Sequence, residues 1–161
     1  MNTKVNQSQS LRNIFGKFAT GVSVVSFFDK NQNPLGITVN SFTSVSLNPP
    51  LALWCVDNKS ELFYDLSSNK NYIFNFLSEE QINVATKLSE KNNHSLTDIS
   101  HHIHANGPVI KNSLGWMACT KKEIISAGDH LIILGLINEF KATEKNLNPL
   151  IFWSGSYQKI N

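Results

Sequence analysis

The sequence predicts a mainly β protein whose strands form a closed or split antiparallel barrel of Greek-key type, flanked by two or three helices. Two observations lead to this prediction. About seven runs rich in β-branched and aromatic residues are bounded by Gly, Pro, Asn or Asp, as strands usually are. These runs do not alternate regularly with helical segments, as the strands of a doubly wound parallel sheet would.

Length and composition indicate a single folded unit. The chain has 161 residues, of which 41% are hydrophobic and 16% are charged, and a chain of this size builds one core more readily than two. Residues 1–9 are polar, and we expect a flexible segment there. We expect residues 10–161 to form one domain.

The first predicted element is a short amphipathic helix that begins with Ser10 as its N-cap and is ended by Gly21. Its apolar positions share one face and are Leu11, Ile14, Phe15 and Phe18. The strand-like runs 22–28 and 35–42 then flank the turn residues 29–34, which predicts a hairpin.

Proline and capping signals divide the middle of the chain. Asn48-Pro49-Pro50 must end a strand near residues 44–47, because proline has no N–H for a ladder, and a new strand follows over 51–57. Residues 61–69 favour a short helix, and residues 71–77 alternate as a strand. The capping-box pattern 78–81 opens a helix that extends to about Glu90.

The last third of the chain is predicted to be a loop followed by β structure. Residues 91–106 are polar and rich in Asn, Ser and His, which is typical of a long surface loop. Three β-rich segments follow over 116–126, 130–140 and 150–160, separated by Ala127-Gly128-Asp129 and by a loop that ends at Asn148-Pro149.

Charge and hydropathy exclude two classes of partner. The net charge is +2 and the lysines are scattered, so no basic patch for nucleic acid is visible. The longest apolar run, Leu131 to Ile137, is far shorter than the roughly 20 residues that span a bilayer, and the N-terminus has no apolar stretch. We therefore expect a cytoplasmic protein that binds neither nucleic acid nor membrane.

The two cysteines, Cys55 and Cys119, lie in apolar runs without CxxC spacing, which favours packing over a redox pair.

The richest stretch for chemistry is 36–50, in which six hydroxyl or amide side chains fall within nine positions, 38–46. A neutral surface of short hydrogen-bonding groups suits the polar edge of a flavin ring. A Ser/Thr-rich edge strand is the alternative that composition alone leaves open.

Beyond these patterns, the run from Arg12 to Tyr157 resembles the flavin reductase-like family, the reductase components of two-component flavin monooxygenases. The resemblance rests on the order and spacing of several pieces. These are Arg12 with FATGVSVVS, GITVNSFTSVSLNPPL, Asn58-Lys59-Ser60, Asn75-Phe76-Leu77 with Gln81, Gly128-Asp129-His130, and PLIFWSGSY.

The resemblance implies an FMN-binding split barrel that forms a homodimer, with FMN or FAD near the subunit interface and NADH or NADPH as hydride donor. It assigns the ring and ribityl contacts to residues in the stretch 38–46, and the phosphate contact to Lys59 with Ser60. A lysine and a hydroxyl at the start of a helical turn also make physical sense as an anion site. The cofactor-binding residues expected on this basis are Thr38, Val39, Asn40, Ser41, Ser44, Val45, Ser46, Cys55, Lys59, Ser60, Asn75, Leu77, Gln81 and Tyr157.

The resemblance also assigns His130 to the nicotinamide side of the flavin, as the candidate catalytic residue, with Asp129 orienting the loop or the imidazole. A histidine can stack on a flat ring or hydrogen-bond a carboxamide. Read without the family, a lone histidine between a turn and a strand is more often structural. Many members carry arginine where this chain has Ser154, and this departure leaves the choice between NADH and NADPH open.

The histidines His94, His101, His102 and His104 invite a metal interpretation. No carboxylate or cysteine stands at a recurring ligand spacing, so we predict no metal site.

Two functions follow from the sequence. The first is an NAD(P)H:flavin oxidoreductase whose reduced flavin diffuses to a separate oxygenase or another acceptor. The alternative is a flavin-binding electron carrier or sensor without an efficient nicotinamide site, which Ser154 favours. Pyridoxamine phosphate oxidation, another chemistry found on split barrels, is a more remote possibility.

Overall fold

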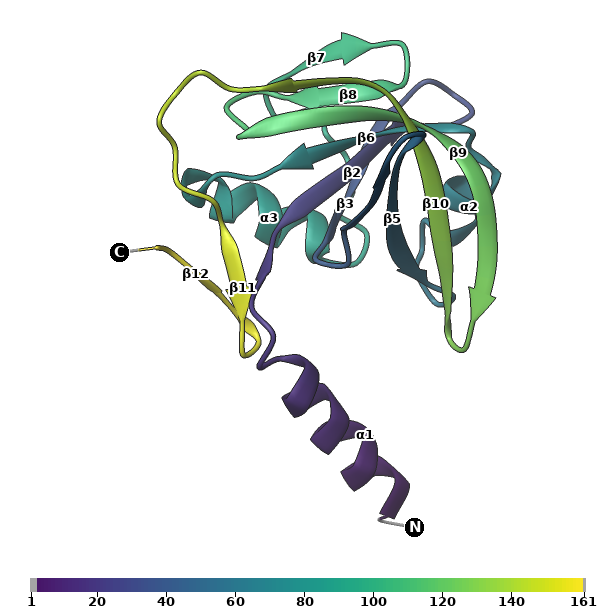
Figure 1. Cartoon of the computed structure of the whole chain (residues 1–161), viewed down its shortest axis with the longest axis vertical. Coiled ribbons are helices and arrows are strands. Elements are labelled where there is room, and N and C mark those ends of the chain that lie inside the picture. Colours follow the sequence, from purple (N-terminus) through teal and green to yellow (C-terminus); the bar gives the residue numbers. More distant parts are fainter. Residues whose placement is uncertain (1–2, 161) are drawn as a thin grey trace.

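A curved antiparallel sheet carries most of the core. In the computed structural model, which describes residues 3–160, seven strands lie in the order β3-β2-β6-β9-β10-β5-β4 (Figure 1). Every pairing in this sheet is antiparallel, and its edge strands β3 and β4 are not paired with each other in the described part of the chain. The sheet therefore curves into a barrel that stays split at one seam, which confirms the predicted fold class.

The strands of this sheet are β2 Ser23–Phe28, β3 Pro34–Val39, β4 Thr43–Leu47, β5 Pro50–Asp57, β6 Asn71–Phe76, β9 Gly115–Ala127 and β10 His130–Ala142. The smaller sheets contain β1 Thr20–Gly21, β11 Ile151–Trp153 and β12 Ser156–Gln158 in one, and β7 His101–His104 and β8 Gly107–Ile110 in the other. The helices are α1 Thr3–Phe15, α2 Phe63–Ser68, the 3-10 turn η1 Glu79–Gln81 and α3 Ile82–Ser89.

The period-2 alternation of β6 sorts its side chains between two cores, as predicted. Tyr72 and Phe74 are buried inside the barrel with Trp54, whereas Ile73 packs on the opposite face of the strand. Phe42 reaches in from the β3–β4 connection and stands edge-on to Phe74, with ring centroids 5.1 Å apart. Aromatic packing of this kind fixes the position of that connection relative to the barrel.

Two local predictions in the first half of the chain are confirmed. The hairpin pairs β2 with β3 from Ser23↔Val39 to Phe28↔Pro34. The capping box is present: the Ser78 side chain meets the backbone of Gln81, and the Ser78 N–H donates to Gln81 Oε1 at 3.0 Å. The turn that it opens is 3-10 before α3 continues as α-helix.

The N-terminal helix is longer than predicted and ends earlier. It begins at Thr3 rather than Ser10, and it ends at Phe15, where the Gly16 N–H still reaches the carbonyl of Arg12 at 2.9 Å. Gly21, the predicted stop, lies in β1 instead. The flexible segment predicted for 1–9 therefore includes helical residues from Thr3 on, while residues 1 and 2 lie outside the described range. Its mobility, and the single domain over 10–161, stay predictions.

Helix α1 projects away from the barrel (Figure 1). Its predicted apolar face is exposed: Ile14 is 68% exposed and Phe15 is 67% exposed, and Leu11 and Phe18 are also exposed. None of the helices within residues 3–160 combines the length and the apolar character that crossing a bilayer requires.

The prediction of a loop over residues 91–106 is wrong for the last part of that segment. Residues His101–His104 form β7, which pairs with β8 from His101↔Ile110 to His104↔Gly107. The Gly107-Pro108 pair resembles a strand breaker in the sequence, yet all four residues of β8 are buried. Gly107 is required there, because a Cβ would lie 2.9 Å from the carbonyl oxygen of Ser26 on β2.

The final β-rich segment is a hairpin rather than one strand. Strands β11 and β12 pair from Ile151↔Gln158 to Trp153↔Ser156. Ser154 and Gly155 form the turn between them, with φ of 50° and 82°. The position at which many family members carry arginine is therefore the tip of a tight turn.

Candidate active site

The polar stretch singled out in the sequence forms a corner between β3 and β4, and Ser41 holds it in place. The Ser41 hydroxyl accepts a hydrogen bond from the Cys55 N–H at 3.0 Å and donates to the Cys55 carbonyl at 3.2 Å. Two bonds from one side chain fix the corner against β5. Cys55 thus enters the site through its backbone, and burial raises the pKa of its thiol.

The side chains of this stretch divide between scaffold and surface. The Thr38 hydroxyl donates to the Ala85 carbonyl at 2.8 Å and so holds α3, and Val39 packs against the barrel core. The predicted residues that remain exposed at the corner and along β4 are Asn40, Ser44 and Val45, while Ser46 is partly buried. The sequence alone did not separate these two groups.

The turn after β5 carries the predicted phosphate contact. The Lys59 N–H donates to Asp57 Oδ1 at 2.8 Å, and the Ser60 N–H donates to the Asp57 carbonyl at 2.9 Å. Helix α2 begins only at Phe63, so Lys59 and Ser60 lie on the preceding turn and not at a helix start as expected. The Lys59 ammonium is exposed and has neither an ion pair nor a hydrogen bond with any described residue, which leaves its charge available to an anion.

The turn between β9 and β10 lies directly beside this lysine turn. The Asn58 N–H donates to the Asp129 carbonyl at 3.0 Å, and His130 is paired with Asp57 in the β5–β10 ladder. Gly128 has a φ of 66°, a conformation that favours glycine. The two turns predicted to contact phosphate and nicotinamide therefore form one end of the sheet.

His130 is oriented by its neighbour in the sequence. Its Nδ1 lies 2.7 Å from Asp129 Oδ1, and its side chain is 42% exposed. The hydrogen bond from the imidazole is the main cause of a lowered pKa for the Asp129 carboxyl. This arrangement leaves Nε2 as the ring nitrogen that can meet a ligand.

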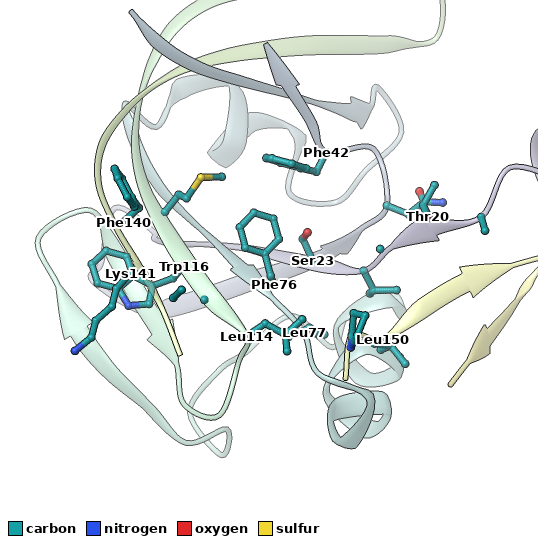
Figure 2. Close-up of a pocket in the computed structure, with 18 of the residues that line it drawn as sticks. Thr20, Ser23, Phe42, Phe76, Leu77, Leu114, Trp116, Phe140, Lys141 and Leu150 are labelled. Carbon is teal, nitrogen blue, oxygen red and sulfur yellow. The ribbon is translucent and has the colours of Figure 1, made fainter. Parts of the chain in front are cut away.

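Asn40 borders two cavities, one on each side of the corner. The larger has a volume of about 640 Å³ and lies between the ends of β6, β9 and β10 and the segment that leads into β2 (Figure 2). Its walls are mostly apolar and include Phe42, Phe76 and Trp116. On its rim, the buried Thr20 Oγ1 has no hydrogen-bond partner among the described residues.

The smaller cavity, of about 350 Å³, is lined by Thr38, Val39 and Asn40 on one side and by Phe152 and Tyr157 on the other. The Tyr157 and Phe152 rings lie edge to face, with centroids 5.6 Å apart. Burial raises the pKa of the Tyr157 hydroxyl. Tyr157 is thus brought to the predicted cradle from the far end of the chain.

Asn75 and Gln81 belong to the scaffold and do not lie at the corner. Asn75 is fully buried; its Nδ2 donates to Ser26 Oγ at 2.8 Å, and its Oδ1 accepts the Ile110 N–H at 2.8 Å. Gln81 Nε2 donates to the Lys111 carbonyl at 3.0 Å. Leu77 is buried but lines the larger cavity. Direct flavin contacts by these three residues stay predictions.

The histidines of the 94–104 segment face different partners. His101 Nδ1 lies 2.7 Å from the Ile99 carbonyl, and His104 Nε2 lies 3.2 Å from Glu139 Oε2. His94 Nε2 lies 3.4 Å from Glu61 Oε2. Within residues 3–160, no group of three or more His, Cys, Asp or Glu residues is arranged to hold a metal ion.

Sequence reasoning missed the aromatic walls of the larger cavity, Trp116 and Phe140, and the orphaned hydroxyl of Thr20. Phe140 is 72% exposed and lies between Glu139 and Lys141 at the exposed end of β10. Sequence periodicity does not predict this exposure, because the same aromatic residue is buried or exposed according to which other elements pack against it. The available signal was that Thr20 lies within FATGVSVVS, one of the pieces on which the family resemblance rests.

Comparison with known proteins gives consistent matches over nearly the whole chain. The flavin reductase like domain model matches residues 15–161. The chain is 34% identical over 155 residues to the FMN reductase (NADH) SmoA of Agrobacterium fabrum, a match that covers 96% of this chain and 87% of that protein. Other relatives are named as reductase components of flavin-dependent monooxygenases.

A second relative is longer than this chain. The chain is 36% identical over 158 residues to a probable flavin reductase of Rhizobium meliloti; the match covers 98% of this chain but spans only half the length of that protein. Among solved structures, the NADH:FAD oxidoreductase SgcE6 of Streptomyces globisporus, in complex with NAD and FAD fragments, superimposes with a TM-score of 0.90 at 26% identity. That match covers 97% of this chain and 94% of the other.

Proposed function

Because this chain belongs to the flavin reductase like domain family, we propose that it transfers hydride from NADH or NADPH to FMN or FAD. The observation that carries the proposal is the shared end of the sheet, where the Asn58–Asp129 hydrogen bond puts Lys59 and His130 on adjoining turns. This juxtaposition supports a site in which Lys59 contacts the flavin phosphate and His130 contacts the nicotinamide side of the flavin.

The residues present fit a flavin. A flavin needs a flat wall, hydrogen-bonding groups along its polar edge and a cation for its phosphate. Asn40 presents an exposed amide at the corner, the buried Thr20 hydroxyl lacks a partner among the described residues, and Lys59 presents an exposed ammonium that forms no ion pair with them. These groups would hold the flavin, which when bound accepts a hydride at N5.

The protein's own contribution is to position the two reactants. Ser41 fixes the corner through Cys55, and Asp129 fixes the imidazole of His130, so both sides of the proposed site are held before a ligand arrives. Hydride transfer requires chiefly that the donor carbon and the acceptor nitrogen be held in contact, so preorganisation of this kind lowers the barrier. We assign no proton transfer to His130.

We further propose that the active form is a homodimer. The apolar face of α1 is exposed, and Phe18 and Phe140, which are 78% and 72% exposed, stand at the larger cavity. Several large apolar side chains exposed on a monomer favour an interaction site. A second copy that covers α1 would also close the cavity next to Asn40, which supports a flavin site near the subunit interface.

For partners and location, we propose that reduced flavin diffuses to a separate oxygenase, in line with relatives named as reductase components of monooxygenases. A cytoplasmic location is proposed as well, with two unpaired cysteines, Cys55 and Cys119, in its support.

Anaerobic spectroscopy tests the function directly. Purified protein with FMN or FAD is mixed with NADH and then with NADPH, and the oxidised flavin absorption band is followed. Loss of the band, with turnover of added flavin, is expected for one nicotinamide. Flavin binding without bleaching by either donor would instead support a flavin carrier, the alternative that the serine at position 154 favours. Ser154→Arg, at the tip of the β11–β12 turn, would then be the first variant to assay with NADPH.

A further inference from the structure

The loop between β8 and β9 borders a small basic cavity that adjoins the larger cavity and shares Trp116 and Lys141 with it. The cavity has a volume of about 300 Å³, and the lining residues that matter here are His102, Lys111, Ser113, Trp116, Lys141 and Thr143. None of its lining residues is Asp or Glu. The net charge of the chain is only +2, yet this cavity is lined by two lysines and a histidine and by no carboxylate. Such a local excess of positive charge favours the binding of an anion.

The positive charge of this basic cavity is not compensated by its surroundings. Lys111 and Lys141 are exposed and form no ion pair with any described residue. Lys145 adds a third cation, because its Nζ donates to the Asn112 side-chain oxygen of the same loop at 3.1 Å. The acid two positions before Lys141, Glu139, lies 3.2 Å from His104 Nε2.

A buried hydroxyl at the cavity also lacks a partner. Ser113 is only 7% exposed and lines the cavity, and its Oγ makes no hydrogen bond with the described residues. Burial of a hydroxyl without a partner is unfavourable. The unpartnered hydroxyl is an observation independent of the lysines, and we infer that an oxygen of the bound anion accepts its hydrogen bond.

The loop that carries these groups is held from several sides. The Lys111 N–H donates to the Ser100 carbonyl at 3.0 Å, and the Leu114 N–H donates to the Phe76 carbonyl at 2.8 Å. Gln81 Nε2 donates to the Lys111 carbonyl at 3.0 Å. A loop fixed in this way loses little conformational entropy when a ligand binds.

Trp116 supplies an aromatic wall. It lines both the basic cavity and the larger apolar cavity, and its ring lies 5.3 Å from that of His104, between centroids. We propose that the basic cavity binds an aromatic small molecule that carries a phosphate or carboxylate group, with the anion between Lys111 and Lys141 and the ring against Trp116.

Lys111 and Ser113 of this site lie outside the larger cavity that Thr20 and Asn40 border, although Trp116 and Lys141 line both cavities. Lys141 is paired with Trp116 near one end of the β9–β10 ladder, whereas His130 is paired with Ala127 at the other end. At roughly 3.3 Å per residue, the two ends lie on the order of 35 Å apart along the strand. The proposal therefore stands whether or not the chain reduces flavin.

Phenyl phosphate is the probe, titrated into ¹⁵N-labelled full-length protein and followed by heteronuclear NMR. We expect saturable shifts of the Trp116 indole N–H, assigned with Trp116→Phe, and of the loop amides from Lys111 to Gly115. The double variant Lys111→Ala/Lys141→Ala should bind about tenfold more weakly, since each lysine supplies a charge-assisted contact. Lys122→Ala, an exposed lysine on β9 outside the cavity, should bind like the wild type.

Further arms distinguish the parts of the ligand. If benzoate shifts the same signals, the site accepts a carboxylate as well as a phosphate. Inorganic phosphate should bind more weakly than phenyl phosphate because it lacks the ring. Equal binding of inorganic phosphate would overturn the role of Trp116. The site itself is overturned if the shifts do not saturate, or if the double variant binds phenyl phosphate as well as the wild type does.

Discussion

The backbone N–H of Asn58 donates to the carbonyl oxygen of Asp129 at 3.0 Å, and this bond joins two turns that are far apart in the sequence. It sets the lysine that follows Asn58 beside the histidine that follows Asp129. The proposed division of labour between Lys59 and His130 depends on this juxtaposition.

Replacement of these two residues should separate binding from turnover. We expect Lys59→Ala to raise the Kd for FMN about tenfold, because a charge-assisted phosphate contact is lost. His130→Ala should lower the rate of flavin reduction about tenfold and change the Kd little, because it affects how the nicotinamide is positioned. Fluorescence titration of FMN and stopped-flow reduction measure the two effects, with Lys30→Ala as the charge-matched control. The assigned roles are wrong if the two variants exchange their effects.

The Asp129–His130 pair should be visible in a carboxyl titration. The hydrogen bond from His130 lowers the pKa of Asp129 below its ordinary value of 3.8. A lowered pKa means that the bond's small contribution to stability is present above about pH 4 and is lost as the pH falls through the folded-state pKa. NMR of the Asp129 carboxyl carbon should give a midpoint below 3.8, and His130→Ala should raise it toward that value. An unchanged midpoint in the variant would contradict the pairing.

Ser41→Ala should loosen the corner. It removes the hydroxyl that bonds both the N–H and the carbonyl of Cys55, and it leaves a partly buried N–H without its acceptor. We expect the free energy of unfolding to fall by about 1–2 kcal/mol, with weaker FMN binding as well. Urea denaturation measures the first effect. Ser126→Ala, at an exposed position on β9, is the control that should leave unfolding unchanged.

Gly135 should tolerate no side chain. A Cβ at this position on β10 would lie 2.1 Å from the hydroxyl oxygen of Tyr72, which is buried in the barrel and cannot move aside. We expect Gly135→Ala to destabilise the protein by about 1–3 kcal/mol through overpacking. Adding Tyr72→Phe, which removes the clashing oxygen, should restore part of the loss. Thermal unfolding checks this, with Gly21→Ala as the control because a Cβ added there would have open space for 4 Å around it.

The exposed face of α1 should hold the dimer together. We expect Ile14→Asp combined with Phe15→Asp to convert a dimer to a monomer at micromolar concentration, because both side chains would place charge in an apolar contact. Sedimentation velocity measures the change. Asn13→Asp adds a charge to the same helix outside its apolar positions and should leave the dimer intact. A wild-type chain that is monomeric at these concentrations would refute the interface.

The sequence by itself determined the elements whose signals are local. Alternation in β6 put Tyr72 and Phe74 in the barrel, Ser78 and Gln81 formed their capping box, and the turn residues 29–34 closed the first hairpin. These features depend on interactions between side chains a few residues apart, so the local sequence is enough to predict them. Family resemblance supplied the fold, which the structure bears out, and the flavin, which is part of the proposed function.

Only the tertiary structure decided which polar residues are scaffold and which are surface. Thr38 and Asn40 look alike in the sequence, yet one holds α3 and the other borders two cavities. Strand β8 was missed because its burial comes from contact with β2, far away in the chain. The basic cavity likewise collects Lys111 and Lys141 from distant elements. The solvent exposure of a side chain and its contact partners depend on residues that are distant in the sequence, so a local pattern does not predict them.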